Sequence, residues 1–395
     1  MNSKIYILFL LLFSTAYSFA QFTLRIEITT TPSAHKEDGV FAAGNFNNWN
    51  ASDMQYRFSS ENNLLVLEMK NLTAKKYQFK FTRGSWQKVE CSSTGIDVAN
   101  KEVQLSSDTT IYYSVAGWMD DYAVARKSTA STNVHVLDTA FFIPQLNKTR
   151  RIWIYLPADY NAVKKHYPVM YLQDGQNLFD VLTSGFGEEW GVDECLDSLI
   201  AKGKNGCIVV GIDNGNATRM NEYNPYELTL KDSTASKVFA PQGNEYLDFL
   251  TQTLKPFIDK KFRTLSSKEN TIVAGSSMGG LISYYAAIQY PEVFGKAGVF
   301  SPAFWTAPQI KLFTDSIAKK ISGKFFFYAG EKESDRMITD MNEVAEKLGA
   351  HSNAMIYSVI DPEGKHNENA WRKWFAEFYV WMMADGYNNV IKLEE

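Results

Sequence analysis

The sequence predicts a mostly parallel α/β domain preceded by a small all-β sandwich. Two patterns lead to this prediction. Residues 21–118 contain short strands of alternating polar and apolar residues without a helical stretch, as in "FTLRIEITTT". From residue 134 onward, short and continuously apolar runs alternate with amphipathic stretches. That alternation is typical of a parallel sheet covered by helices on both faces.

The length and composition fit a globular protein of two unequal domains. The chain has 395 residues, of which 45% are hydrophobic and 21% are charged. Its formal net charge of -4 gives no electrostatic basis for binding nucleic acid or an anionic membrane surface. We therefore expect a neutral or weakly charged partner. Aromatic residues make up 14% of the chain, which suits both large cores and flat, hydroxylated ligands.

The first twenty residues have the features of a secretory signal. "MNSKIYILFLLLFSTAYSFA" carries one early Lys4, an apolar stretch from Ile5 to Phe13, and the small residues Ser18 and Ala20 before an expected cut. An uncleaved membrane anchor is the alternative, but the apolar stretch is short for a bilayer. We expect a secreted or periplasmic protein with no membrane contact after cleavage.

A linker is predicted between the two domains. Residues 119–133, "MDDYAVARKSTASTN", lose periodicity and become small and polar, which separates a sandwich at 21–118 from a second domain at 134–395. The three cysteines, Cys91, Cys195 and Cys207, allow at most one disulfide, and pairing of Cys195 with Cys207 is left open. Their spacing does not suit a metal, so no metal site is expected.

Individual elements follow from the apolar runs and the turns between them. In the first domain, strands are expected at 22–31 and 77–82, with turns at Gly44, Asn47, Asn48 and Gly84. In the second, strands are expected at 150–157, 167–175, 207–214, 271–274, 297–304, 324–330 and 354–360. Helices are expected at 188–203, 244–262, 281–291, 335–350 and 369–386. Chemistry in such sheets collects at the carboxyl ends of the strands.

One of these strand ends carries a G-x-S-x-G motif. Gly275-Ser276-Ser277-Met278-Gly279 lies between the strand of 271–274 and the helix from Leu281, which is the setting of a nucleophile elbow. The turn leaves little room for side chains next to Ser277, and the following helix N-terminus favours developing negative charge. We predict Ser277 as the nucleophile, with Ser276 pointing into the fold. A glycine-rich turn without chemistry is the alternative.

A serine nucleophile needs a base and an acid. Of five histidines, only His366 follows a late strand in a polar loop before the last helix, in the chain order serine, acid, histidine. The acid is expected after the strand of 324–330, where Glu331, Glu333 and Asp335 compete. We favour Glu333, because Glu331 directly follows the strand and Asp335 lies where a helix cap is needed. A solvated loop histidine is the alternative for His366.

Two backbone amides would complete an oxyanion hole. One is expected from Met278, directly after the nucleophile, and the other from the loop "QDGQNLF" after the strand that ends at Leu172. By position Gln176 is preferred, with Gly175 second. An ordinary surface turn is the alternative for this loop.

The span of residues 147–386 resembles the esterase D-like family of α/β-hydrolases. The matching segments occur in order as "RRIWIYLPADY", "YPVMYLQDGQNLFD", "GSSMGG", "YAGEKES" and "GKHNENAW". This family includes feruloyl and acetylxylan esterases, enterochelin esterases, S-formylglutathione hydrolases and mycolyl transferases. The resemblance implies an α/β-hydrolase fold, and Glu333 matches its acid position. Two departures are Asp174-Gly175 where many members have His-Gly, and Glu where Asp is commoner.

A second resemblance concerns the first domain. "GNFNNWN" and "YQFKFTRGSWQKVE" are similar to starch- and glycogen-binding modules of the immunoglobulin-like sandwich class. The resemblance implies that Trp49 and Trp86 stack on glucose rings and that Lys80 and Asn100 make polar sugar contacts. Packing of both tryptophans within the protein is the alternative.

Together these features predict a secreted serine carboxylic ester hydrolase that removes acetyl or feruloyl groups from glycans, without a cofactor. A siderophore esterase or an acyltransferase on the same site is the enzymatic alternative. A non-catalytic glycan-binding protein, with the hydrolase domain as a scaffold, is the alternative of another class. The predicted partners are an ester substrate and a polysaccharide held by the first domain.

Overall fold

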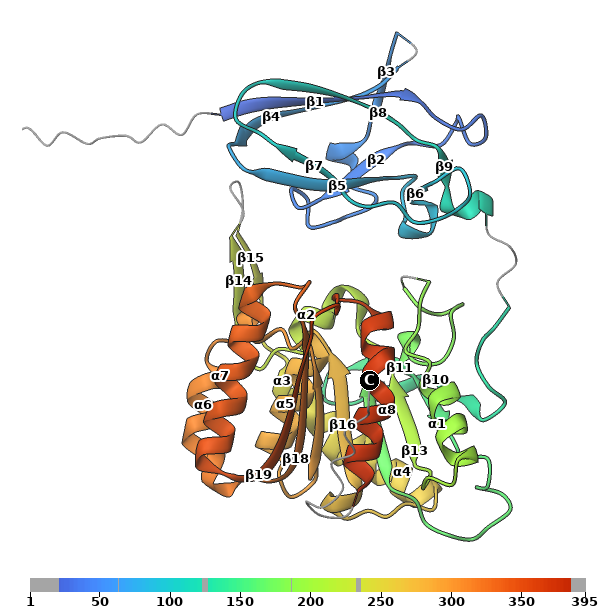
Figure 1. Cartoon of the computed structure of the whole chain (residues 1–395), viewed down its shortest axis with the longest axis vertical. Coiled ribbons are helices and arrows are strands. Elements are labelled where there is room, and N and C mark those ends of the chain that lie inside the picture. Colours follow the sequence, from blue (N-terminus) through green and yellow to red (C-terminus); the bar gives the residue numbers. More distant parts are fainter. Residues whose placement is uncertain (1–20, 63, 123–126, 186, 232–235, 385–395) are drawn as a thin grey trace, which may run out of the picture. The chain divides into compact units, whose positions relative to one another are not determined.

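The computed structural model describes residues 21–62, 64–122, 127–185, 187–231 and 236–384 (Figure 1). They form two compact units, which meet in the sequence between Arg126 and Lys127. The predicted signal peptide, residues 1–20, lies outside the described residues. Within the described ranges, no helix combines the length and the apolar character needed to cross a membrane.

The N-terminal unit is built from short strands. One sheet has the order β3-β4-β1-β8, a second has the order β2-β5-β7, and β6 pairs with β9. Neighbours are antiparallel except β1 and β8. The strands are β1 (Gln21–Thr30), β2 (Phe41–Gly44), β3 (Ser59–Glu61), β4 (Leu64–Thr73), β5 (Lys76–Thr82), β6 (Glu90–Cys91), β7 (Lys101–Gln104), β8 (Thr109–Ser114) and β9 (Gly117–Trp118). Short 3-10 helices are η1 (Met54–Tyr56), η2 (Trp86–Lys88) and η3 (Met119–Tyr122).

Alternation along these strands builds the core of the unit. Leu24, Ile26 and Ile28 of β1 and Phe79 and Phe81 of β5 are buried in one apolar cluster, while the residues between them are more exposed. A period of two places every second side chain on the inner face. The predicted all-β character of this segment follows directly from that pattern.

The C-terminal unit contains an eight-stranded sheet of order β10-β11-β13-β12-β16-β17-β18-β19. β10, β11 and β13 are joined by antiparallel pairs, and from β13 to β19 all neighbours are parallel. The strands are β10 (Val134–Ile143), β11 (Lys148–Tyr155), β12 (Val169–Gln173), β13 (Ile208–Ile212), β16 (Thr271–Ser276), β17 (Lys296–Phe300), β18 (Ser322–Gly330) and β19 (Asn353–Asp361). A separate hairpin is formed by β14 (Leu228–Lys231) and β15 (Ser236–Phe239).

Helices cover both faces of this sheet (Figure 1). One apolar cluster joins the sheet to α3, α4, α5, α6 and α7, and another joins it to α1 and α8. The helices are α1 (Val192–Ala201), α2 (Arg219–Glu222), α3 (Gly243–Asp248), α4 (Lys255–Lys261), α5 (Met278–Gln289), α6 (Ile310–Ile317), α7 (Asp335–His351) and α8 (Glu368–Met383). Short elements are η4 (Gly175–Asn177), η5 (Asn216–Thr218), η6 (Phe249–Leu254), η7 (Lys268–Asn270), η8 (Phe304–Thr306) and η9 (Ala318–Lys320).

The predicted helix start at Leu281 is wrong by three residues. β16 continues to Ser276 and α5 begins at Met278, so only Ser277 separates strand from helix. The predicted helix of 244–262 is interrupted by the π-helical turn η6. In α5 every side chain from Met278 to Ile288 is buried, which explains why its sequence shows no polar face.

The predicted linker, residues 119–133, is only partly a connecting segment. Met119–Tyr122 form η3 in the N-terminal unit, and residues from Ser128 onward lie on the C-terminal unit. Ser128 Oγ donates to Asp180 at 2.7 Å, and the Asn133 amide donates to Asp197 at 2.8 Å. Small polar side chains therefore serve as hydrogen-bond donors in a segment whose composition suggested a free tether.

Candidate functional site

Ser277 lies on a strained turn at the carboxyl end of β16. Its φ of 58° and ψ of -121° lie in a region that residues with a side chain rarely occupy. Three backbone hydrogen bonds hold it there: its N–H donates to Phe300 O, and its carbonyl accepts from Leu281 and Ala303, all at 2.9–3.0 Å. The turn is fixed by its neighbours, and backbone strain of this kind clusters at functional sites, so Ser277 stays the candidate nucleophile.

The glycines around Ser277 are required by close packing. A Cβ on Gly275 would lie 2.9 Å from the Gln173 side chain, and one on Gly280 would lie 2.8 Å from Phe300 O. A Cβ on Gly279 would approach Asp174 Oδ2 to 2.9 Å. Side chains at these positions would push the elbow away from β12 and β17, so the glycines determine where Ser277 lies.

His366 and Glu333 are joined across neighbouring strand ends. His366 lies between β19 and α8, and its Nδ1 is 2.7 Å from Glu333 Oε2. The Glu333 side chain is 2% exposed, while that of His366 is 39% exposed. The acid is therefore inside the fold and the imidazole at the surface of the site. Of the competing acids, Glu331 is exposed, and the N-cap hydrogen bond of α7 from Met337 N is accepted by the Ser334 side chain.

Ser301 connects this pair to the elbow. Its hydroxyl donates to Glu333 Oε1 at 2.6 Å and accepts from Trp371 Nε1 at 2.9 Å. In the chain, Ser301 directly follows Phe300, whose carbonyl accepts from Ser277 N–H. Within the described ranges no hydrogen bond joins Ser277 Oγ to His366; such bonds often form only when substrate is bound. Ser301 and Trp371 were not anticipated from the sequence: Ser301 lies outside the matching segments, and Trp371 ends the segment "GKHNENAW" without a role that the pattern indicates.

The two predicted oxyanion donors lie in the first turns of helical segments. Met278 is the first residue of α5, and Gln176 is the second of η4, with Gly175 before it. N–H groups in the first turn have no acceptor within their own helix, so they are available to a ligand. The Gln176 carbonyl accepts from Thr183 Oγ1 at 2.7 Å, which fixes the peptide on its carboxyl side.

A buried ion pair positions the loop before Gln176. Asp174 has left-handed backbone angles (φ 57°, ψ 48°) and its carboxylate accepts from Arg219 Nε at 2.6 Å, Arg219 Nη2 at 2.7 Å and Asn214 Nδ2 at 2.7 Å. Arg219 also donates to the carbonyl of Ser276 at 3.4 Å. This bidentate pair involves the Asp174 that was noted as a departure from the resemblance, and it ties the loop to the elbow.

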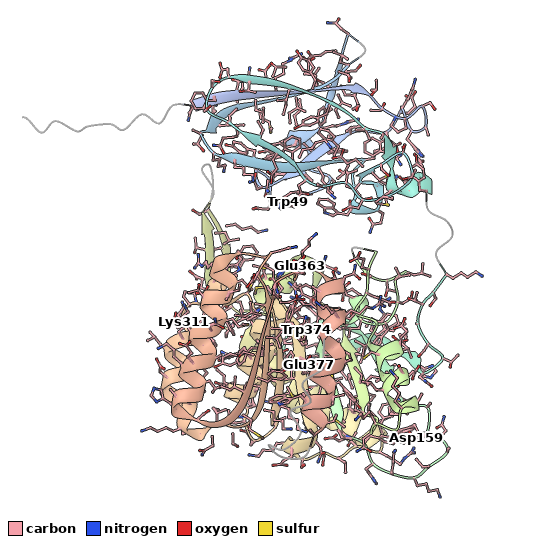
Figure 2. The ribbon with its side chains drawn as sticks, in the orientation of Figure 1. Trp49, Asp159, Lys311, Glu363, Trp374 and Glu377 are labelled. Atoms are coloured by element: carbon pink, nitrogen blue, oxygen red, sulfur yellow. The ribbon has the colours of Figure 1, made fainter. Side chains whose placement is uncertain are left out.

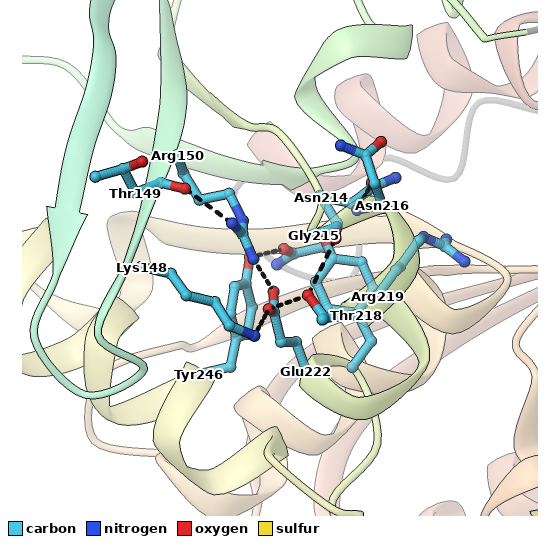
Figure 3. Close-up of polar contacts among 12 residues, drawn as sticks. Lys148, Thr149, Arg150, Asn214, Gly215, Asn216, Thr218, Arg219, Glu222 and Tyr246 are labelled. Carbon is cyan, nitrogen blue, oxygen red and sulfur yellow. Dashed lines mark hydrogen bonds and ion pairs between the residues drawn. The ribbon is translucent and has the colours of Figure 1, made fainter. Parts of the chain in front are cut away.

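The segment that carries Asn214 and Arg219 is itself anchored by Glu222 (Figure 3). The fully buried Glu222 carboxylate accepts from Lys148 Nζ at 2.7 Å, from Thr218 Oγ1 at 2.6 Å and from Arg150 Nη2. These partners hold the pKa of Glu222 below its ordinary value despite its burial. The anchored segment can therefore hold Arg219 in a fixed position.

Two further residues, in segments that contact the site, were not anticipated from the sequence. Trp305, in η8, is 39% exposed and lies between Ala303, which bonds to Ser277, and Thr306, whose hydroxyl is 3.4 Å from Met278 Sδ. Glu368 is the first residue of α8 and is 4% exposed. Burial, with a smaller contribution from the Asp174 carboxylate, raises the pKa of Glu368 to about 7.

Of the four predicted sugar-binding residues, the structure brings Trp49 and Trp86 together in the N-terminal unit. The rings of Trp49 and Trp86 are 6.2 Å apart at an angle of 39°, and both side chains are half-buried outside the apolar core (Figure 2 labels Trp49). Lys80 is paired with Asp97 at 2.6 Å, and Asn100 is exposed. The tryptophans can offer aromatic surface to a ligand, whereas a sugar contact by Lys80 would compete with its ion pair.

Other features lie away from Ser277. A cavity of about 630 Å³ opens at the amino ends of the parallel strands, lined by Lys165, Lys268 and Lys296 among others, and no predicted catalytic residue lines it. Within the described ranges, no group of three or more His, Cys, Asp or Glu side chains could hold a metal ion. Cys195 and Cys207 are both free thiols, so the disulfide left open by the sequence is not formed.

Comparison with known families identifies the C-terminal unit. A family described as "Putative esterase" matches residues 143–381. The chain belongs to this esterase family. The protein is accordingly an ester hydrolase by family, and the predicted α/β-hydrolase fold with a β-rich N-terminal region is confirmed by the sheet and by its structural neighbours.

Two curated relatives differ in what is known of them. Uncharacterized protein YbbA of Bacillus subtilis is 29% identical over 189 residues, which cover 47% of this chain and 69% of that protein. An endo-1,4-beta-xylanase/feruloyl esterase of Xylanibacter ruminicola is 28% identical over 241 residues, which cover 60% of this chain and 30% of that protein.

Solved structures share the fold. The BES protein of Bacillus cereus matches with a TM-score of 0.54 at 18% identity, covering 67% of this chain and 99% of that one. The enterobactin esterase FES of Shigella flexneri matches with a TM-score of 0.50 at 14% identity, covering 92% and 93%. At these identities the comparison shows the fold alone.

Proposed function

We propose that the esterase is a secreted serine hydrolase that removes acetyl or feruloyl groups from glycans, with Ser277, His366 and Glu333 as its catalytic triad. The hydrogen bond between His366 Nδ1 and Glu333 Oε2 carries this proposal, because it leaves Nε2 of the imidazole to act as the base. The strained elbow at the carboxyl end of β16, in the same sheet, supplies the nucleophile.

Each residue has a defined role in the proposed reaction. His366 takes the proton of Ser277 Oγ as the oxygen attacks the ester carbonyl, and the amides of Met278 and Gln176 stabilise the oxyanion. The imidazole then protonates the leaving alcohol, and an acyl-enzyme remains. Water, deprotonated by the same imidazole, releases the acid and restores Ser277. Glu333 orients the imidazole and stabilises its charged form.

The preference for a glycan ester rests on two observations. Part of the chain is similar to the bifunctional xylanase/feruloyl esterase, and the half-buried pair Trp49 and Trp86 offers aromatic surface of the kind that stacks on sugars. Trp305, which is 39% exposed and follows Ala303 by two positions in the chain, is the aromatic residue that we propose for contact with an aromatic acyl group. The coverage of 92% of this chain by the enterobactin esterase favours siderophore ester hydrolysis as the second candidate.

Activity of the purified protein tests these alternatives. Hydrolysis of p-nitrophenyl acetate, methyl ferulate, acetylated xylan and a catecholate ester should be compared for wild type and Ser277→Ala. The glycan proposal expects acetyl or feruloyl esters to give the highest kcat/KM, and loss of several orders of magnitude in Ser277→Ala. Preference for the catecholate would favour the siderophore alternative. Equal hydrolysis by folded Ser277→Ala would refute the serine mechanism. Wild-type protein that hydrolyses none of these esters would favour the non-catalytic glycan-binding alternative.

A further inference from the structure

The first turn of α8 contacts both halves of the candidate site. On one side, Trp371 Nε1 donates to Ser301 Oγ at 2.9 Å, and Ser301 in turn donates to Glu333. On the other side, Glu368 Oε1 accepts a hydrogen bond from Asn177 Nδ2 at 3.2 Å. Asn177 directly follows Gln176. The N-terminal end of α8 therefore contacts both the residues that hold Glu333 and the loop of the expected oxyanion donor Gln176.

Asn177 is held by hydrogen bonds at its backbone and its side chain. Its N–H donates to Asp174 O at 2.9 Å, and its carbonyl accepts from Trp190 N at 2.9 Å. Its side-chain oxygen accepts from Gly185 N at 3.0 Å, so its amide nitrogen is directed to Glu368. The orientation of the amide is thus determined by two different partners, and one of them, Glu368, begins the helix that follows the His366 loop.

Glu368 is unusual for an acid at a helix N-terminus because it is almost fully buried. The proposed triad does not use it. The charged groups that act on it are Asp174 from the oxyanion loop, Glu188 from the loop before α1, His366 from its own segment and Arg219 from α2. Burying a carboxyl group among two other acids is costly, so retaining Glu at this position calls for a specific contact.

We propose that Glu368 is a positioning residue that, through its hydrogen bond with Asn177, holds the loop of Gln176 in register with His366. This inference rests on the proposed serine mechanism. The oxyanion donor and the base must both reach the same ester group of the substrate. A displacement of either by about 1 Å can reduce the rate about 100-fold. Without the bond, the loop and the helix would be free to shift independently.

Three variants separate the hydrogen bond from the rest of the packing. Asn177→Asp keeps the acceptor for Gly185 N–H, removes the donor to Glu368 and places two carboxyl groups together. At pH 8 we therefore expect kcat for p-nitrophenyl acetate to fall about 10- to 100-fold, with KM changed less than about threefold. Glu368→Gln keeps an acceptor for Asn177 and should retain most of kcat. In Asn177→Asp/Glu368→Gln the new amide can donate to the new carboxylate, so kcat should recover to within about threefold of wild type.

The double variant decides the proposal. Recovery of kcat supports a positioning bond, whereas a double variant as slow as Asn177→Asp, or an Asn177→Asp protein with wild-type kcat, would overturn it. Glu363→Ala, in the same loop but in an exposed ion pair with Lys332, is the matched control and should have wild-type kcat (Figure 2 labels Glu363). If Ser277→Ala has the same kcat as wild type, the serine mechanism fails instead.

Melting temperatures of wild type, Asn177→Asp, Glu368→Gln and the double variant then still report whether residues 177 and 368 are coupled. Additive shifts in melting temperature would show that the two residues are not coupled and would overturn the proposal.

Discussion

Replacing Glu333 by Gln should inactivate the esterase through the tautomer of His366. Glu333 Oε1 accepts from Ser301 Oγ at 2.6 Å and from Gly330 N at 2.8 Å, and Oε2 faces His366 Nδ1 at 2.7 Å. Since the Gly330 N–H can only donate, the Gln oxygen must occupy the Oε1 position. The Gln NH₂ group then faces Nδ1, which must become an acceptor. The imidazole proton moves to Nε2, where a base is needed.

The expected loss of kcat is about 10⁴-fold, the order observed when a triad acid is replaced by its amide. This corresponds to about 5 kcal/mol of transition-state stabilisation. Steady-state hydrolysis of p-nitrophenyl acetate at pH 8 provides the assay. Glu331→Gln, which changes an exposed acid in the same loop, is the control and should have wild-type kcat. If Glu333→Gln stays within tenfold of wild type while Asp335→Asn loses activity, the assignment of the acid is wrong.

Three further predictions concern stability and binding. The pKa of Glu368 is raised from 4.5 to about 7, so its contribution to the free energy of unfolding is present below pH 4.5 and is lost as the pH rises through 7. The free energy of unfolding of Glu368→Gln should therefore rise by up to about 3 kcal/mol relative to that of wild type between pH 5 and pH 8. A difference in denaturant midpoints that stays the same over this range would contradict the prediction. Trp49→Ala/Trp86→Ala should abolish retention on α-glucan or another polysaccharide without affecting p-nitrophenyl acetate hydrolysis, whereas a wild-type protein retained by no polysaccharide would indicate a packing role. Trp305→Ala should raise KM for methyl ferulate about three- to tenfold and leave that for p-nitrophenyl acetate nearly unchanged, and equal effects on both would exclude an aromatic contact.

Local patterns were sufficient to predict most of the fold. The continuously apolar runs that became β12, β16 and β18 are buried on both faces, and such runs are recognisable without knowing their neighbours. The position of Ser277 follows from the glycines and from the strand and helix beside it. The preference for Glu333 came from loop geometry and family position, and the structure places that side chain against His366.

The residues that could not be predicted act through contacts distant in the sequence. Asn177 and Glu368 are 191 positions apart, and an acid at a helix start ordinarily indicates a favourable interaction with the helix dipole. Asp174 was noticed as a departure from histidine, but its partner Arg219 lies on a short helix without a motif. Both pairs depend on the order of the strands, which brings separate loops together at the carboxyl ends of the strands.

The nucleophile is the central claim, and covalent labelling tests it most directly. Wild-type protein should be treated with a fluorophosphonate probe while residual esterase activity is followed, and the modified peptide should be located by mass spectrometry. We predict a single adduct on Ser277, loss of activity in proportion to labelling, and no adduct in Ser277→Ala. An active protein that is labelled at another residue, or that keeps its activity when Ser277 is fully modified, would contradict the account.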